Sequence, residues 1–251
     1  MLSEQRYDVI LKLLDEKKSI TVAEVKELLD TSESTVRRDI TALHNAGRLV
    51  KVFGGAVVLD RNYTSHEPTV AQKEEVNKDE KMLLAQYAAS LIEEEEFVYL
   101  DAGTTTGCML DYITEESATF VTNAVAHAQK LARRGMRVIL IGGELKGSTE
   151  AVVGNQAMET LQQYHFTKGF FGTNGISRNE GFTTPDANEA LIKKTAMGQC
   201  RQRYILGDYS KFDKISSVTF APFYSATVLT ERIAEGYSDC KNILVVKKAD
   251  V

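Results

Sequence analysis

Asp101-Ala-Gly-Thr-Thr-Thr-Gly107 is the stretch on which the fold of the longer part of the chain depends. It follows an apolar run, Phe97–Leu100, that predicts a β-strand, and it precedes Cys108–Ile113, whose apolar residues have helical spacing. The pattern predicts a strand–loop–helix corner. Glycines and hydroxyl side chains at a helix start present backbone N–H groups and a positive dipole end to an anion, most naturally a phosphate. The alternative is a tight turn with a helix cap and no ligand.

This stretch matches neither of the two common phosphate-binding motifs. No Gly-Lys-Ser/Thr follows it, as a Walker A loop requires, and Gly103 and Gly107 lack the spacing of the dinucleotide fingerprint. The identity of a bound anion must therefore be inferred from the other residues that reach the same corner.

Length and composition are those of an ordinary globular protein. The 251 residues are enough for one large or two modest domains, and 43% apolar residues can bury a full core. The net charge of −5 excludes a broad nucleic-acid coat but not a local basic patch. Three widely spaced cysteines predict neither a disulfide framework nor a metal site. With no signal sequence and no apolar run near ~18 residues, we expect a cytoplasmic protein that does not enter a membrane.

Residues 1–58 carry the pattern of a winged helix-turn-helix, a small DNA-binding domain. Apolar residues at helical spacing predict three helices, over residues 3–17, 21–30 and 32–46. Thr21 and Glu24 form a capping box, Ser32 caps the third helix, and Gly47 stops it. The second helix is expected to bury Val22, Val25, Leu28 and Leu29. Two short apolar strands, 49–53 and 54–58, follow around a Gly-Gly turn.

The third helix has a polar face that suits DNA. Ser34, Thr35, Arg37 and Arg38 point away from its apolar stripe, and arginine side chains in the major groove can reach guanine edges or phosphates. Between positions 37 and 51 there are four basic residues and one acidic residue. Positive charge is thus concentrated where a recognition helix and a wing would meet phosphate. The alternative is a solvated surface helix in a protein-binding module.

The remainder of the chain predicts a linker and a second domain. Residues 59–77 are polar and without period, which is typical of a linker. An alanine-rich helix is expected over 78–95, and its acidic end, Glu93–Glu96, is interpreted as solvated. Alternating strands and helices then predict an α/β domain, 78–251, with a mostly parallel sheet. The expected strands are 97–100, 119–122, 137–141, 168–172, 203–206, 227–229 and 243–246, and the expected helices 106–113, 124–134, 155–164 and 188–200.

Small or polar residues follow five of the expected strands. In parallel sheets ligands bind beyond the carboxyl ends of the strands, so these residues predict a common polar pocket. They are Asp101 with its threonine loop, Thr122-Asn123, Gly142-Gly143, Gly172–Gly175 and Gly207–Lys211.

Three further residues are candidates for this pocket. Glu189 and Lys193 lie four residues apart on an expected helix, and the alternative for them is a surface ion pair. Lys211 could equally be a solvated loop lysine. Lysines suit a phosphate and carboxylates suit sugar hydroxyls, but two acids and a lysine could also transfer protons at a carbonyl. The four scattered histidines fit no metal site.

With these residues identified, the chain resembles the DeoR family of bacterial sugar-catabolism regulators. The resemblance is carried by Ser32–Asp39, Gly54–Ala56 and Asp101–Thr105, and it runs essentially end to end. Within the family the chain looks closest to the fructose-operon repressors of Gram-positive bacteria. The effector domain of the family is similar in fold to ribose-5-phosphate isomerase and coenzyme A transferases.

The resemblance implies a repressor, not an enzyme, whose binding to operator DNA changes when a phosphorylated sugar binds. Fructose 1-phosphate is the first candidate effector and fructose 1,6-bisphosphate the second, with no cofactor or metal, and the family works as homo-oligomers. The implied DNA contacts are Ser34, Thr35, Arg37, Arg38, Arg48, Lys51, Gly54 and Gly55. The implied effector contacts are Asp101, Gly103, Thr104, Thr105, Thr106, Thr122, Asn123, Gly142, Gly143, Glu189, Lys193, Asp208 and Lys211. The rival hypothesis is a sugar-phosphate isomerase with an appended DNA-binding module.

Overall fold

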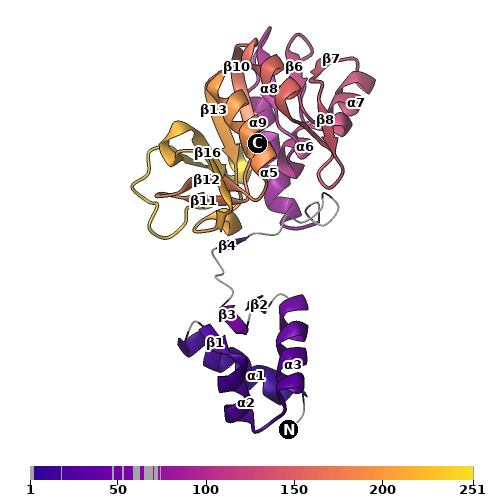
Figure 1. Cartoon of the computed structure of the whole chain (residues 1–251). Coiled ribbons are helices and arrows are strands. Elements are labelled where there is room, and N and C mark those ends of the chain that lie inside the picture. The colour runs from indigo at the N-terminus through magenta and orange to yellow at the C-terminus, as the bar shows by residue number, and fades with distance from the viewer. Residues whose placement is uncertain are drawn as a thin grey trace. The chain divides into compact units, whose positions relative to one another are not determined.

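The structure is a computed structural model (Figure 1), which describes residues 3–17, 19–46, 48–52, 54–58, 63–64, 70, 73 and 75–250. Its contacts divide the chain into two compact units, residues 1–61 and 62–251. The predictions for Gly47, for Phe53 and for much of the segment 59–77 lie outside the described residues. In the described part of the chain, no helix is both long and apolar enough to cross a membrane.

The first unit is a winged helix-turn-helix, as predicted. Its helices are α1 (Ser3–Lys17), α2 (Val22–Leu29) and α3 (Glu33–Asn45). Its strands pair in the order β1 (Ser19–Thr21), β3 (Gly55–Val58) and β2 (Leu49–Val52), and β1 was not predicted because three residues show no period. The helices bury one apolar cluster, in which Ile10, Val25 and Val36 are fully inaccessible.

Local sequence explains where these helices begin. The Thr21 side chain accepts a hydrogen bond from the Glu24 backbone, and the Glu24 carboxylate accepts one from the Thr21 backbone at 2.7 Å. The Ser32 hydroxyl caps α3 by accepting from the Thr35 N–H at 3.2 Å. Each such cap contributes about 1 kcal/mol. The prediction that Leu28 is buried was wrong: it is 54% exposed, whereas the next residue, Leu29, packs against the core.

Asp39 on α3 is buried, which the sequence pattern did not predict for an acidic residue. The Arg6 guanidinium donates two hydrogen bonds to its carboxylate, at 2.6 and 2.9 Å. The pair compensates the burial of the charge. It holds α1 against α3 on the side away from the exposed arginines of α3.

The second unit is built on a seven-stranded sheet in which every neighbouring pair is parallel. Its strands lie in the order β17 (Ile243–Val245), β16 (Thr227–Thr230), β13 (Cys200–Leu206), β10 (Phe166–Gly172), β5 (Phe97–Leu100), β6 (Thr119–Thr122) and β7 (Arg137–Leu140). All seven predicted strands are present, with boundaries that differ by at most three residues.

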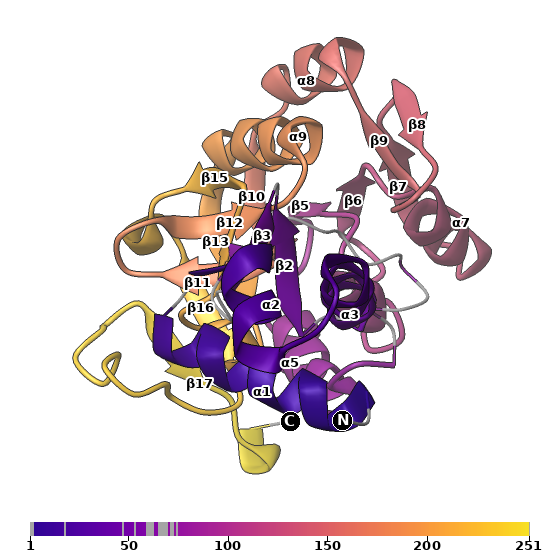
Figure 2. The same ribbon diagram turned by 60° about the horizontal axis from the view of Figure 1, so that its bottom comes forward.

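Helices cover both faces of this sheet. Alternate strand residues such as Leu100 and Phe170 join the cluster under α5 (Lys78–Ser90), α6 (Thr104–Met109) and α7 (Val125–Arg133). Their neighbours Tyr99 and Phe171 pack on the other face with α8 (Asn155–Gln162) and α9 (Ala187–Gly198). Figure 2 shows α8 and α9 side by side on that face. Each fully buried phenylalanine contributes about 1.5–3 kcal/mol, so the two cores hold the strand ends rigidly.

Three small sheets surround the central one and were not predicted. One pairs β11 (Gly175–Ser177), β12 (Gly181–Thr184) and β15 (Val218–Ala221). A hairpin pairs β8 (Glu144–Lys146) with β9 (Ala151–Val153). The third pairs β4 (Tyr63–Thr64) with β14 (Ile215–Ser216), in parallel. Short 3-10 helices complete the unit: η1 (Tyr209–Lys211), η2 (Phe223–Ser225) and η3 (Lys248–Asp250).

Glu93, Glu94 and Glu95 of the acidic run are exposed, as expected, but the run follows α5 and is not the end of the helix. The helix ends at Ser90, and Glu95 has a positive φ of 58°. The ammonium group of Lys168, which is 5% exposed, lies 3.0 Å from the Glu96 carboxylate and 3.2 Å from that of Glu93. The run thus neutralises a buried lysine at the amino-terminal end of the sheet.

The strand order reverses between β5 and β10. From β5 the chain continues through β6 and β7 to one edge, and from β10 it continues through β13, β16 and β17 to the other. Loops that follow strands at such a switch point diverge and leave a crevice at the carboxyl ends. Asp101 follows β5 and Gly172 ends β10, so both lie at this crevice.

Candidate functional site

The exposed face of α3 carries the predicted DNA-reading residues. Ser34, Arg37 and Arg38 are exposed, and Thr35 is half-buried. The hydroxyls of Ser34 and Thr35 each lie 2.9 Å from the Ser32 hydroxyl, so they belong to the N-cap network. Arg37 pairs with the exposed carboxylate of Glu33 at 2.6 Å, an interaction weak enough for a DNA phosphate to replace.

The wing is attached closely to α3 and to β1. The Lys51 ammonium group donates to the Thr41 hydroxyl at 2.9 Å, and Arg48 is exposed. Gly54 is exposed with a φ of +81°, whereas a Cβ at Gly55 would lie 2.0 Å from the carbonyl oxygen of Ile20. Gly55 therefore permits the close approach of β3 to β1, which any side chain at this position would block. Among the described residues, Arg38 and Arg48 have no ion-pair partner.

The second unit contains a cavity of about 260 Å³ at the carboxyl ends of β5 and β10. It is lined by Val70, Lys73, Val76, Lys81, Asp101, Ala102, Gly103, Thr104, Thr105, Asn123, Thr149, Ala151, Gly172, Thr173, Asn174, Glu189, Lys193, Ser210, Lys211 and Lys214. Charged lining residues are five lysines and two carboxylates, so the cavity carries a formal charge of +3.

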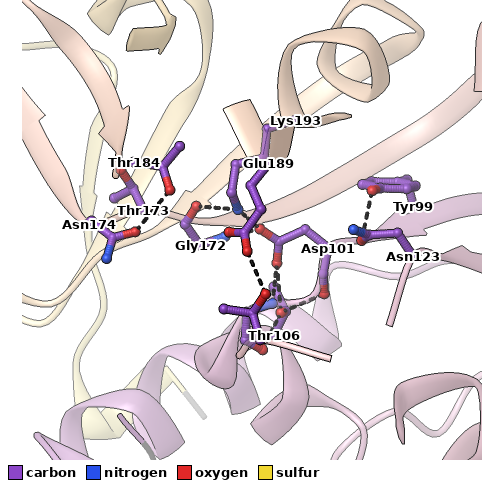
Figure 3. A network of polar contacts seen from close by, with 12 residues as sticks. Tyr99, Asp101, Thr106, Asn123, Gly172, Thr173, Asn174, Thr184, Glu189 and Lys193 are labelled. Atoms are coloured by element: carbon purple, nitrogen blue, oxygen red, sulfur yellow. Dashed lines mark hydrogen bonds and ion pairs between the residues drawn. The ribbon is translucent and has the colours of Figure 1, made fainter. Parts of the chain in front are cut away.

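Asp101 is the centre of a hydrogen-bond network at the switch point (Figure 3). One carboxylate oxygen accepts from the Gly103 N–H at 2.9 Å and from the Thr106 hydroxyl at 2.8 Å. The other accepts from the Gly172 N–H at 2.8 Å and from the ammonium group of Lys193. Lys193 also donates to the Gly172 carbonyl at 3.0 Å. Asp101 is 1% exposed, and this network joins the β5 loop, β10 and α9.

Glu189, one turn before Lys193 on α9, does not pair with that lysine. Its carboxylate accepts from the Lys146 ammonium group at 2.9 Å and from the Thr149 hydroxyl at 2.5 Å. The Asp186 side chain caps α9 by accepting from the Glu189 N–H at 2.9 Å, and it also lies 3.1 Å from Lys146. The β8–β9 hairpin is thereby held to the start of α9.

Four lysines form a second electrostatic feature of the cavity, which we call the lysine group: Lys73, Lys81, Lys211 and Lys214. Burial lowers the pKa of Lys81, and the nearby charge of Lys211 lowers it further. Burial also lowers the pKa of Lys211. The nearby charge of Asp208 raises this pKa and partly offsets the effect, whereas the charges of Lys73 and Lys214 lower it further. Because these ammonium groups repel one another, the group favours an anion.

Asn123 lines the cavity but its amide is engaged on both sides. The Tyr99 hydroxyl, which is fully buried, donates to its oxygen at 3.0 Å, and its nitrogen donates to the Val152 carbonyl at 3.1 Å. Desolvation raises the pKa of Tyr99 well above its ordinary value, so the phenol remains a neutral donor. Asn123 positions the wall beside β9.

Two family models match the chain. The DeoR-like helix-turn-helix domain matches residues 6–62, and the DeoR C terminal sensor domain matches residues 76–232. This chain belongs to the DeoR family. It is 38% identical to the uncharacterized HTH-type transcriptional regulator FruR of Bacillus subtilis, over 98% of this chain and all of that protein. It is 34% identical to the lactose phosphotransferase system repressor of Streptococcus mutans, over 96% of this chain and 95% of that repressor.

Among solved structures, the ribose 5-phosphate isomerase A of Methanocaldococcus jannaschii is similar with a TM-score of 0.41 and 12% identity, over 54% of this chain and 55% of that one.

Eight of the thirteen effector contacts expected for this DeoR-family chain line the cavity. They are Asp101, Gly103, Thr104, Thr105, Asn123, Glu189, Lys193 and Lys211. The structure brings them together from the β5 and β6 loops, from α9 and from η1.

The other five expected contacts do not line the cavity. Thr106 is fully buried beneath Asp101, and the buried Thr122 hydroxyl accepts from the Ala124 N–H at 3.1 Å. A Cβ at Gly143 would lie 2.6 Å from the Val153 carbonyl oxygen, and Gly142 precedes it outside the lining. Asp208 caps η1 by accepting from the Ser210 N–H at 3.0 Å.

Sequence reasoning missed Lys81, the most buried member of the lysine group. A signal was present, because Lys81 lies three, four and seven residues before Leu84, Ala85 and Ala88 on the apolar stripe of α5. A lysine in an apolar stripe is expected to be buried and to have a specific partner. Thr149 and Lys214 were also missed, and no pattern in the sequence marks them, whereas Thr173, Asn174 and Ser210 lie in the strand-end segments that were predicted to form the pocket. Within the described residues, no group of three or more potential metal ligands is present.

Proposed function

We propose that this DeoR-family protein represses a sugar-catabolism operon, most directly one for fructose, and that a phosphorylated sugar in the cavity controls its binding to operator DNA. The observation that carries the proposal is the charge of the cavity, five lysines against two carboxylates. A phosphate carries about −2 at neutral pH and is held best by several partly desolvated lysines. The names of the relatives, a regulator and a repressor of a sugar transport system, agree with this proposal.

In this proposal the two groups of the cavity have different roles. The lysine group and the backbone N–H of Thr104 hold the phosphate. Glu189 would accept hydrogen bonds from sugar hydroxyls through the carboxylate oxygen that does not bond Lys146 and Thr149, and Asn174 would donate through its amide nitrogen. Lys193 is neutralised by Asp101 and orients that carboxylate. Fructose 1-phosphate is the first candidate effector and fructose 1,6-bisphosphate the second.

In the first unit, the exposed polar face of α3 would enter the major groove. Arg38 and Arg48 would contact bases or phosphates directly, and Arg37 would leave its ion pair with Glu33 to bind DNA. A homo-oligomer would place two such helices on a repeated or palindromic operator.

The experiment that tests the proposal is a thermal-shift panel followed by operator binding. The panel comprises fructose 1-phosphate, fructose 1,6-bisphosphate, fructose 6-phosphate, ribose 5-phosphate, unphosphorylated fructose and inorganic phosphate. A ligand at 100 times its dissociation constant stabilises the fold by about 2.7 kcal/mol. We expect a sugar phosphate to stabilise the protein more than fructose or inorganic phosphate, and to change operator affinity. Stabilisation by none of them would contradict the proposal.

The rival hypothesis, a sugar-phosphate isomerase, would use Glu189, Asp101 and Lys193 as its acid–base set. The network around Asp101 disfavours it, because both carboxylate oxygens already accept two hydrogen bonds each and the group is 1% exposed. Such a carboxylate is a poor general base. Incubation with ribose 5-phosphate and the fructose phosphates, monitored for interconversion, separates the two hypotheses.

A further inference from the structure

The segment that leads from the first unit into α5 forms part of the cavity wall. Val70, Lys73 and Val76 line the cavity, although each precedes α5 in the chain. Upstream of them, β4 pairs in parallel with β14, through Tyr63 with Ile215 and Thr64 with Ser216. Described residues of the chain between the DNA-binding unit and the sheet therefore line the cavity that a ligand would occupy.

Asn77 attaches this segment to η1. Its amide nitrogen donates to the Asp208 carboxylate at 2.9 Å and to the Ser210 hydroxyl at 3.1 Å. Its backbone has a φ of 52° and a ψ of 48°, in the left-handed region, and its side chain does not cap α5. Asparagine adopts the left-handed region more readily than most residues, and the two hydrogen bonds to η1 stabilise it there.

Lys81 attaches the same segment from the other side. Its ammonium group donates to the backbone carbonyl of Lys73. The same ammonium group lines the cavity and is the most buried cation of the lysine group. An anion that binds Lys81 contacts the same ammonium group that holds the Lys73 carbonyl, so a shift of this group toward the anion also acts on Lys73.

The structure of η1 provides a second path to the segment. Lys211, in the cavity, is the last residue of η1, and Ser210 and Asp208 beside it hold Asn77. Four residues after Lys211 the chain enters β14, whose partner is β4. A ligand that moves η1 thus acts on the segment at two points, Asn77 and β4.

We propose that Asn77 is the positioning residue that couples the cavity to the interdomain segment. Effector binding at Lys81 and Lys211 shifts these two lysines and η1, and Asn77 transmits this shift to the described residues of the segment, Tyr63, Thr64, Val70, Lys73 and Val76. This inference rests on the proposed function and adds the route by which the effector alters DNA binding. Coupling of this kind requires two arrangements that the ligand binds unequally.

The test compares full-length wild type with Asn77→Gly. Glycine adopts the left-handed conformation without strain, so the variant loses only the two side-chain hydrogen bonds. Asn155→Ala is the matched control, because Asn155 is exposed at the start of α8 and does not line the cavity. Operator affinity is measured by fluorescence anisotropy with and without whichever of fructose 1-phosphate, fructose 6-phosphate and fructose 1,6-bisphosphate binds wild type most tightly.

We expect the sugar phosphate to change the operator dissociation constant by about tenfold in wild type and Asn155→Ala, and by less than about threefold in Asn77→Gly. Asn77→Gly should still bind the sugar phosphate, within about fivefold of wild type, because it removes no lining residue. An unchanged response in Asn77→Gly, or complete loss of sugar-phosphate binding, would overturn the inference alone. A wild type that binds none of the three would overturn the proposed function as well.

Hydrogen–deuterium exchange provides a readout that needs no variant. On addition of the same sugar phosphate to wild type, peptides covering residues 63–82 should change their exchange together with those covering 208–216. Exchange that changes only around residues 101–107 would contradict a role for the segment.

Discussion

Replacing Lys81 by methionine tests whether the lysine group holds the phosphate. Methionine keeps most of the length and apolar contacts of the stem but removes the charge. Lys81 is 4% exposed and lies in the cavity beside Lys211. A hydrogen bond to a charged group contributes about 1.5–3 kcal/mol, so Lys81→Met should weaken sugar-phosphate binding about 10- to 150-fold.

The same substitution should not destabilise the empty protein. Burial and the charge of Lys211 lower the pKa of Lys81, so its charged form is disfavoured in the folded state relative to the unfolded chain. The contribution of Lys81 to the free energy of unfolding is therefore lowest at pH values below its pKa in the folded protein, and it rises as the pH increases toward its pKa in the unfolded chain. At neutral pH, Lys81→Met should leave the unfolding midpoint unchanged or raise it.

Isothermal titration of the sugar phosphate and urea unfolding measure the two effects separately. Lys194→Met is the matched control, because Lys194 is the exposed neighbour of Lys193 on α9 and does not line the cavity. Binding by Lys81→Met within about threefold of wild type would refute the assignment of the phosphate to this group. Weaker binding accompanied by a large fall in stability would show that Lys81 acts through the fold instead.

Three other substitutions test separate parts of the structure. Arg38→Ala should weaken operator binding by about 1–3 kcal/mol and reduce its salt dependence, measured by anisotropy at several salt concentrations, while sugar-phosphate binding is unchanged. Thr106→Val removes the hydroxyl donor to the buried Asp101 carboxylate and should destabilise the second unit by about 1–3 kcal/mol in urea. Burial holds the pKa of His127 at about 4, below its ordinary 6.5, so the unfolded chain binds its proton first. Because the folded protein keeps His127 neutral, its free energy of unfolding should fall by about 3 kcal/mol as the pH falls from 6.5 to 4. This loss should be absent from His127→Gln and present in His165→Gln.

Each of these expectations has a contradicting result. Retained operator affinity in Arg38→Ala would place the DNA-reading face elsewhere than on α3. Equal stability of Thr106→Val and Thr106→Ser would show that the hydroxyl contributes nothing to the network around Asp101. Parallel pH–stability curves for wild type and His127→Gln would mean that this histidine is not held neutral by burial.

The sequence predicted the central sheet well and the small sheets not at all. Strands such as Phe97–Leu100 are apolar runs buried on both faces, and that pattern is local. The strands β11 and β12 are short and contain glycine, serine and threonine, so their pattern is that of turns. Their pairing with β15, more than thirty residues later, depends on tertiary contacts that no window of sequence contains.

The candidate site was predicted in part for the same reason. Strand ends at a switch point converge by topology, which brought Asp101 and Gly172 into one cavity. Helical spacing suggested that Lys193 pairs with Glu189, whereas it pairs with Asp101, ninety-two positions away. The partners of Asn77 lie in η1, and spacing within one helix or strand carries no information about them.

The measurement that tests the central claim most directly is operator binding by the full-length protein, titrated with fructose 1-phosphate and the other sugar phosphates of the panel. We predict that one of them shifts the operator dissociation constant about tenfold in wild type, a coupling of about 1.4 kcal/mol, and that Lys211→Ala abolishes the shift without changing affinity in its absence. A sugar phosphate that binds the cavity and leaves operator affinity unchanged, or a Lys211→Ala variant that responds normally, would contradict the account.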